Sequence, residues 1–245
     1  MLLTDLGRFA LMLKGMFTRP ESLRMFWKQF MRQCVDIGLG SLGIVLIISV
    51  FIGGVSTIQT AYQLVSPLIP RSTVSMVVRD TMILEFAPTI TCIVLAGVVG
   101  SKIASELGNM RVSEQIDALE IMGINPKGYL ILPKILAALL TIPMLVVISG
   151  FVGIWAGKFA GQVADILSAK DYMIGLHAEF KSFNITFALI KAYSFAFIIS
   201  SISSYFGYYV KGGALEIGKA STKAVVVSCI FILLADYGLA ALLLA

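Results

Sequence analysis

Three ionisable side chains lie in stretches that are otherwise apolar, and they are the first residues in this sequence that could carry chemistry. Glu85 and Lys191 each lie near the edge of such a stretch, and Asp236 lies about 12 residues inside another. If these stretches cross a membrane, each charge costs at least about 2.5 to 3.5 kcal/mol, so its presence indicates a function or a partner. Pro88 weakens the helix near Glu85.

We expect Glu85 and Lys191 to share one depth and face one cavity, where they would hold each other or bind a zwitterionic headgroup. The alternative is a structural glutamate and a lysine that extends to the membrane surface. For Asp236 we expect a buried structural partner, with a place along a transport path as the alternative.

A second group of charges lies between residues 105 and 126, in the loop that follows the second apolar stretch. Ser113 is predicted to cap a helix of two to three turns that stops at Gly123 and Pro126. Ile116 and Leu119 form an apolar edge, and acidic residues form the other side. Such a helix is too short to cross a membrane, so we expect it to bind a partner, although any loop helix can have a solvated polar face.

Other motifs do not support chemistry in this chain. The segment from Gly213 to Lys219 has the spacing of a phosphate-binding loop, but Ala220 stands where Ser or Thr must hold magnesium. His177 is the single histidine and the three cysteines are scattered, so we expect no metal site. No nucleophile with a base can be assembled, and we predict no catalytic residue and no cofactor bound by this chain.

The composition excludes a soluble domain. Of the 245 residues, 58% are apolar and 13% are charged, about half the charged fraction that a water-facing surface needs. The same composition excludes a disordered chain or a disulfide framework. The net charge of +5 indicates cytoplasmic loops and lipid headgroups rather than nucleic acid.

Stretches with little or no charge predict an all-α integral membrane protein with five transmembrane helices. A hydrocarbon core of about 30 Å needs about 20 helical residues. The predicted spans cover residues 38–57, 83–101, 135–157, 192–210 and 224–244. Residues 58–81 are open to two interpretations, as extensions of the first two spans or as a short outside hairpin.

The distribution of Lys and Arg predicts the orientation. With a cytoplasmic N-terminus, 13 of the 19 lie on the cytoplasmic side and 6 outside. The positive-inside rule therefore places the N-terminus inside and the C-terminus outside.

Residues 1–36 form a predicted N-terminal region of one or two interfacial amphipathic helices, before a five-span domain over residues 37–245. Apolar residues recur at helical spacing at Leu2, Leu6, Phe9, Leu13 and Phe17. Asp5 and Arg8 argue against a signal peptide. Packing on a partner subunit is the alternative.

Two stripes of small residues predict close helix packing and are compatible with a dimer. They comprise Gly153, Gly157 and Gly161, and Ala96, Gly100, Ala104 and Gly108.

One block of about 50 residues resembles a known family. It runs from Glu106 to Pro126, continues through Tyr129 to Lys134, and includes the Gly-Ile-Trp-Ala-Gly sequence that begins at Gly153. This block is similar to the MlaE family of ABC-transporter permeases. The resemblance extends over roughly residues 80 to 240.

The resemblance implies a homodimeric lipid permease of a bacterial inner membrane, with a cytoplasmic coupling helix at about 106–124. It implies three further partners: a cytoplasmic ABC ATPase dimer that binds ATP and magnesium, a periplasmic oligomer of MCE-domain protein, and often a STAS-domain subunit. By position in the motif, the residues that couple to the ATPase would be Glu106, Arg111, Glu114, Gln115, Asp117 and Glu120.

The resemblance also places Glu85 and Lys191 at the substrate. The family pattern there is Arg-Glu-Leu-Gly-Pro, whereas this chain has Leu84 in place of the arginine, so only Glu85 and Pro88 match. Two other functions stay open from the residues alone, a membrane-embedded enzyme that modifies lipid and a proton-coupled secondary transporter.

Overall fold

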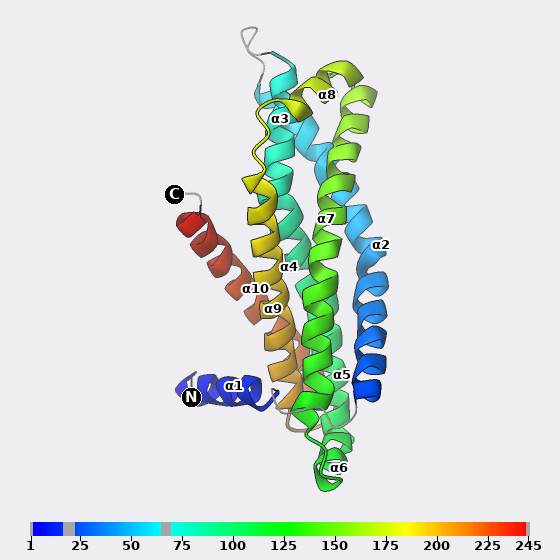
Figure 1. Ribbon diagram of the computed structural model, residues 1–245, viewed down its shortest axis with the longest axis vertical. Coiled ribbons are helices and arrows are strands. Elements are labelled where there is room, and N and C mark those ends of the chain that lie inside the picture. Colours follow the sequence, from blue (N-terminus) through cyan, green and yellow to red (C-terminus); the bar gives the residue numbers. More distant parts are fainter. Residues whose placement is uncertain (1, 17–22, 65–69, 244–245) are drawn as a thin grey trace. The chain divides into compact units, whose positions relative to one another are not determined.

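The computed structural model describes residues 2–16, 23–64 and 70–243, and every regular element in these residues is a helix (Figure 1). The prediction of an all-α protein is confirmed. The elements are α1 (Leu2–Met16), α2 (Leu23–Gln63), α3 (Ser72–Thr81), η1 (Met82–Ile90), α4 (Thr91–Leu95), η2 (Ala96–Gly100), α5 (Ser101–Val112), α6 (Gln115–Ile121), η3 (Lys127–Ile131), α7 (Leu132–Val163), α8 (Ala169–His177), α9 (Phe183–Tyr208) and α10 (Ala214–Leu243). The three elements named η are π-helical.

Five continuous helical segments within the described residues are long and apolar enough to cross a membrane, as predicted. They are Arg24–Gln63, Ser72–Val112, Lys127–Val163, Phe183–Tyr208 and Ala214–Leu243. A helix of 40 residues is about 60 Å long, about twice the hydrocarbon thickness, so several of these helices extend into the aqueous phase.

The helices that contain the predicted spans are longer than those spans. The fourth helix begins at Phe183, whereas the predicted span begins at residue 192, and the second begins at Ser72, whereas the predicted span begins at residue 83. The prediction ended each of these spans near a charged residue, but a helix continues past a charge that is paired inside the protein. Of residues 58–81, those up to Gln63 and from Ser72 onward extend the first two spans, while Pro67 lies outside the described residues.

Among its described residues, the N-terminal region contains one separate helix, α1. Residues 23–36 continue without a break into the first span as part of α2, so a second separate helix is not present there. Met12 and Met16 of α1 are buried, and the Phe9 ring lies 5.8 Å from the Tyr205 ring of α9. The helix runs across the end of α9 rather than along it (Figure 1). Phe17 and Pro20 lie outside the described residues.

The chain divides into two compact units. The first comprises Met1–Ser41, Ile93–Ile142 and Ser194–Gly238, and the second comprises Leu42–Cys92, Pro143–Tyr193 and Leu239–Ala245.

In the first unit, α5 and α9 touch through their backbones. A Cβ atom on Gly207 would lie 2.6 Å from the Ala104 carbonyl oxygen, and one on Gly100 would lie 2.8 Å from Ser203 Oγ. Gly108 faces Ile217 of α10 in the same way. The small-residue stripe of the second span is therefore a packing face inside the chain.

In the second unit, α2 crosses α7 at two glycines. A Cβ atom on Gly53 would collide with the backbone of Gly153, and Gly157 packs against Thr57 and the Tyr172 hydroxyl. Beside this crossing, Ser149 Oγ lies 2.8 Å from both Ser49 Oγ and Thr91 Oγ1. The second small-residue stripe thus also packs within the chain, and its polar neighbours satisfy one another.

Candidate functional site

Glu85 and Lys191, both in the second unit, form an ion pair. Lys191 Nζ lies 2.8 Å from Glu85 Oε1 and donates another hydrogen bond to the Leu84 carbonyl at 3.0 Å. The lysine side chain has no exposed surface, whereas the glutamate side chain is 43% exposed. The expectation that the acid and the base hold each other is confirmed, while their binding of a substrate stays a prediction.

The local backbone explains how Lys191 reaches two acceptors. Pro88 lies inside π-helical η1 and has no N–H group. In an α-helix, the N–H group of residue 88 would bond to the carbonyl of Leu84. In this π-helical segment the Leu84 carbonyl accepts a hydrogen bond from the Lys191 ammonium. Single π-helical turns occur often at functional sites in membrane and soluble proteins.

The surroundings of the ion pair differ on its two sides. The Lys191 ammonium lies 4.8 Å from the centre of the Phe187 ring, a distance at which the ring face attracts a cation. Thr89 Oγ1 donates a long hydrogen bond of 3.3 Å to Glu85 Oε2. The buried side thus fixes the base, and the partly exposed side leaves carboxylate oxygen accessible to a polar group.

A groove of about 480 Å³ lies beside the same π-helical segment. Two apolar residues of η1 line it: Phe86, which follows Glu85 in the sequence, and Ile90. From α2, its walls combine apolar Phe51 and Val55 with polar Gln59 and Gln63. A groove with one apolar wall and a polar end suits an amphipathic molecule.

Arg79 holds helix α8 of the second unit, a role that was not predicted from the sequence. Its side chain is 3% exposed and donates hydrogen bonds to the carbonyls of Leu176 and Ala178 at 2.8 and 2.7 Å, and a longer one to Gly175 at 3.5 Å. Arg79 Nε also lies 2.9 Å from Asp80 Oδ1. The cation therefore satisfies the carbonyls at the C-terminus of α8, which lies beside α3 (Figure 1).

Tyr172 anchors the middle of α8. Its hydroxyl donates to the Ile154 carbonyl at 2.9 Å, and its ring packs with Val74, Val78 and Met82. Burial raises the pKa of Tyr172 to about 12, so the hydroxyl remains a donor throughout the physiological range.

The loop of the first unit forms the second candidate site. Residues 106–124 are divided between the end of α5 and the seven-residue helix α6. Ser113 is not the N-cap of α6, so that prediction is wrong. Ser113 Oγ donates back to the Asn109 carbonyl, and Glu114, in the left-handed conformation with φ 59°, precedes the helix. Gly123, with φ +80°, follows the end of α6 as predicted.

Two side-chain contacts hold α6 in place. Arg111 Nη1 of α5 lies 2.6 Å from Asp117 Oδ1, and the Tyr208 hydroxyl of α9 donates to Glu120 Oε1 at 3.1 Å. Arg111 also lies 6.0 Å from the centre of the Tyr208 ring. Sequence reasoning missed Tyr208, because an aromatic residue at the end of a span looks like an ordinary interfacial residue.

The six residues predicted to couple to an ATPase therefore differ in their surroundings. Glu106 is paired with Lys134 of α7 at 2.6 Å, and that lysine side chain is fully buried. Glu114 and Gln115 are exposed. At the end of α6, which extends beyond α5 (Figure 1), Ile121 and Met122 are 87% and 64% exposed.

Asp236 lies within α10 in the first unit and is partly buried. It does not belong to the unit that holds Glu85 and Lys191. Its proposed roles stay predictions.

Fold and sites together define a polytopic helical membrane protein with a paired charge inside its spans and a short loop helix tethered to two of them. The profile of the Permease MlaE family matches residues 30–242. The chain therefore belongs to the MlaE family of ABC-transporter permeases.

Individual relatives agree with this assignment. A probable ABC transporter permease protein of Rickettsia bellii is 34% identical over 233 residues, covering 95% of this chain and 90% of the relative. The protein TRIGALACTOSYLDIACYLGLYCEROL 1, chloroplastic, of Arabidopsis thaliana is 35% identical over 214 residues, covering 87% of this chain and 61% of the relative. A probable ABC transporter permease protein of Synechocystis is 32% identical over 229 residues, with 94% and 84% covered.

Proposed function

We propose that this permease moves phospholipid or a related lipid between membranes and that a separate ATPase subunit drives it. The observation that carries the proposal is the Glu85–Lys191 pair with its partly exposed carboxylate, on the same π-helical segment whose Phe86 and Ile90 line an amphipathic groove. The partly exposed carboxylate is available to the cationic part of a zwitterionic headgroup, and the groove offers an apolar wall to an acyl chain. The name of the Arabidopsis relative, which contains that of a glycolipid, supports the same substrate class.

The tethered helix α6 supports a coupling role. Its exposed end presents Ile121 and Met122, with Glu114 and Gln115 exposed at its start. An exposed apolar tip on a charged helix suits insertion into a cleft of another protein. Because α6 is bonded to both α5 and α9, a displacement of α6 would move two spans.

The proposal includes the partners and location that the family resemblance implies. These are a second copy of the chain, a cytoplasmic ATPase dimer, a periplasmic MCE-domain oligomer and a STAS-domain subunit in a bacterial inner membrane. The charge distribution supports a cytoplasmic N-terminus and a periplasmic C-terminus. Apolar side chains exposed on α10, among them Leu234 at 62% and Tyr237 at 78%, are available to lipid or to the second copy.

The substrate role is tested with the complex reconstituted in liposomes that contain a fluorescent phospholipid. Replacing Glu85→Gln together with Lys191→Met should reduce ATP-dependent lipid movement and copurifying phospholipid by at least about tenfold, equivalent to the loss of about 1.4 kcal/mol of binding. The matched control is Glu179→Gln with Lys181→Met, which removes one acid and one base from an exposed loop of the same unit. Unchanged transport and lipid content in the first double variant would refute the substrate role.

The coupling role is tested separately with Gln115→Ala and Ile121→Ala. We expect ATP hydrolysis by the complex to continue while lipid movement falls, with the purified chain unfolding at the same temperature. Fully coupled transport in both variants contradicts this role, and lipid movement or product formation by the isolated chain without ATP contradicts the ATP-driven proposal itself.

A further inference from the structure

The first unit contains a pocket that none of the residues of the two candidate sites lines. It has a volume of about 460 Å³ and is formed by α1, the end of α9 and the start of α10. Among the described residues that line it are four cations, Arg8, Lys211, Lys219 and Lys223, and one carboxylate, Glu216. The pocket therefore carries a clear excess of positive charge.

The rest of the wall is aromatic and apolar. Tyr205, Phe206 and Tyr209 line it from α9 and the turn that follows. The Lys223 ammonium lies 5.3 Å from the centre of the Phe206 ring, so an aromatic face holds this cation at the pocket. Burial raises the pKa of Tyr209, with Arg8 acting in the opposite direction, so the phenol is a neutral hydrogen-bond donor.

The cations remain accessible although some of them have partners. Lys219 Nζ lies 2.7 Å from Glu216 Oε1, but the two side chains are 63% and 44% exposed. An exposed pair of this kind contributes little stability, so an incoming anion can compete for the lysine. Lys211 is exposed in the turn that Gly212 closes with φ +118°.

The position of the pocket favours a lipid as the source of an anion that binds these cations. Both α9 and α10 are candidate spans, and the pocket lies where they are joined, at Tyr209 to Gly213. Such a joint lies at the boundary between hydrocarbon and water. Basic pockets between membrane helices at this level suit the phosphate of an anionic lipid, and the aromatic wall suits its glycerol and upper acyl chain.

We propose that this pocket binds the headgroup of an anionic phospholipid and thereby joins α1 to the turn between α9 and α10. The Phe9 contact with Tyr205 already places α1 at the pocket, and Arg8 adds its charge from the same helix. The site differs from the Glu85–Lys191 pair, which offers one acid and one base. It does not depend on the transport proposal.

The test uses the full chain, purified in detergent, and native mass spectrometry to count bound lipid. Dioleoylphosphatidylglycerol is titrated against dioleoylphosphatidylcholine, and sodium phosphate is added as a third arm. The wild-type chain should retain one phosphatidylglycerol at least about tenfold more strongly than phosphatidylcholine, because each basic residue near a headgroup contributes about fivefold in affinity. Millimolar phosphate should not displace it, since phosphate lacks the apolar part.

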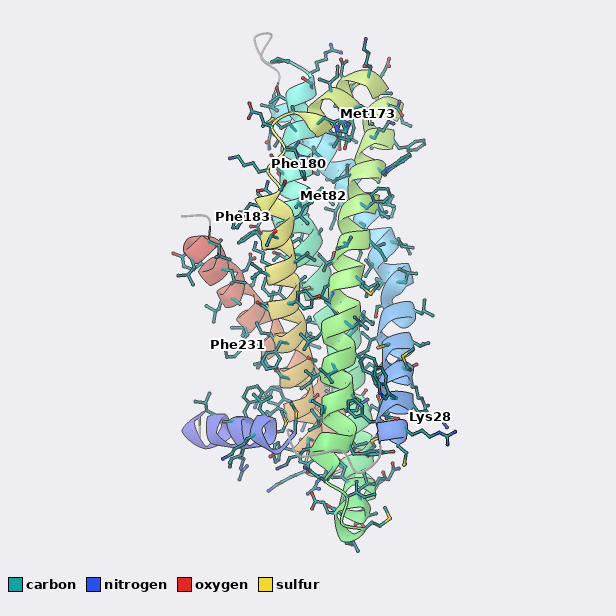
Figure 2. All side chains as sticks on the ribbon, viewed as in Figure 1. Lys28, Met82, Met173, Phe180, Phe183 and Phe231 are labelled. Carbon is teal, nitrogen blue, oxygen red and sulfur yellow. The ribbon has the colours of Figure 1, made fainter. Side chains whose placement is uncertain are left out.

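Three variants decide the outcome. Lys219→Gln with Lys223→Gln should weaken phosphatidylglycerol binding by about 25-fold, about fivefold for each lysine. The matched control is Lys28→Gln, an exposed lysine of the same unit whose side chain points away from the helices (Figure 2) and which does not line the pocket. Glu216→Gln removes the carboxylate of the pocket and should strengthen binding by about threefold, a gain that misfolding cannot produce.

Equal retention of the two lipids, an equal loss in Lys28→Gln, weaker binding in Glu216→Gln, or displacement by free phosphate would each overturn the proposal.

Discussion

Replacing Glu85 is expected to destabilise the protein more than replacing Lys191, although the two residues form one ion pair. The reason is the difference in burial, because the lysine side chain has no exposed surface and the glutamate side chain is 43% exposed. Glu85→Gln leaves a buried ammonium without its counter-charge. Lys191→Met leaves a carboxylate that water and Thr89 can still solvate.

The magnitude follows from the geometry. At 2.8 Å and an effective dielectric constant of about 20, the charges attract by about 6 kcal/mol, most of which offsets the desolvation of Lys191. Loss of one partner of a fully buried pair costs about 3 to 5 kcal/mol. Because Glu85 is partly exposed and glutamine keeps a hydrogen bond, we expect about 2 kcal/mol for Glu85→Gln. For Lys191→Met we expect about 1 kcal/mol or less.

The assay is unfolding with sodium dodecyl sulfate in mixed micelles, followed by the fluorescence of Trp27 and Trp155. The double variant should be about as stable as Lys191→Met, which gives a coupling energy of about 2 kcal/mol. Equal costs for the two single variants, a larger cost for Lys191→Met, or additive effects in the double variant would refute the reasoning.

Variants at three other residues, two of them with a control at a further residue, test the packing of the second unit by the same unfolding measurement. Arg79→Ala should lower the free energy of unfolding by about 3 kcal/mol, because it removes the donor to the α8 carbonyls. Arg79→Lys should recover about half of that loss. Arg71→Ala, at an exposed residue, should change the free energy of unfolding little. Gly53→Ala should cost more than about 2 kcal/mol, because its Cβ atom would collide with the Gly153 backbone where α2 and α7 touch, and Gly43→Ala, which has open space around it, should stay within about 1 kcal/mol of the wild type. Burial raises the pKa of Tyr172 to about 12 from about 10, so the contribution of its neutral hydroxyl to stability is complete below pH about 10. The free energy of unfolding should then fall by about 1.4 kcal/mol per pH unit as the pH rises to about 12. Tyr172→Phe should abolish this pH-dependent loss.

The sequence predicted the helical class and the number of spans because these depend on the distribution of charge and apolar residues. It did not show that the helix of the fourth span begins at Phe183, before the predicted span, because a single sequence does not show whether Lys191 has a partner. The π-helical segment around Pro88 was predictable only as a weak point, since a π-turn depends on what packs around it.

In the loop helix α6, too, the features that depend on neighbouring residues were easier to predict than the contacts between residues far apart in the sequence. Its stop at Gly123 follows from a local preference and was predicted, whereas Glu114 begins the helix in place of Ser113. The contacts of Glu120 with Tyr208 and of Glu106 with Lys134 join residues 88 and 28 positions apart. Such pairs cannot be derived from spacing within one helix, which is why Tyr208 and Lys134 were not predicted as site residues.

The ion pair between the second and fourth spans also affects the order in which the protein is made. Glu85 leaves the ribosome 106 residues before Lys191, so the second span enters the membrane without its counter-charge. A lone charge inside the membrane costs about 2.5 to 3.5 kcal/mol, and the same applies to the fourth span inserted alone. The pair therefore lowers the cost of holding the second span in the bilayer only after the fourth span has been made.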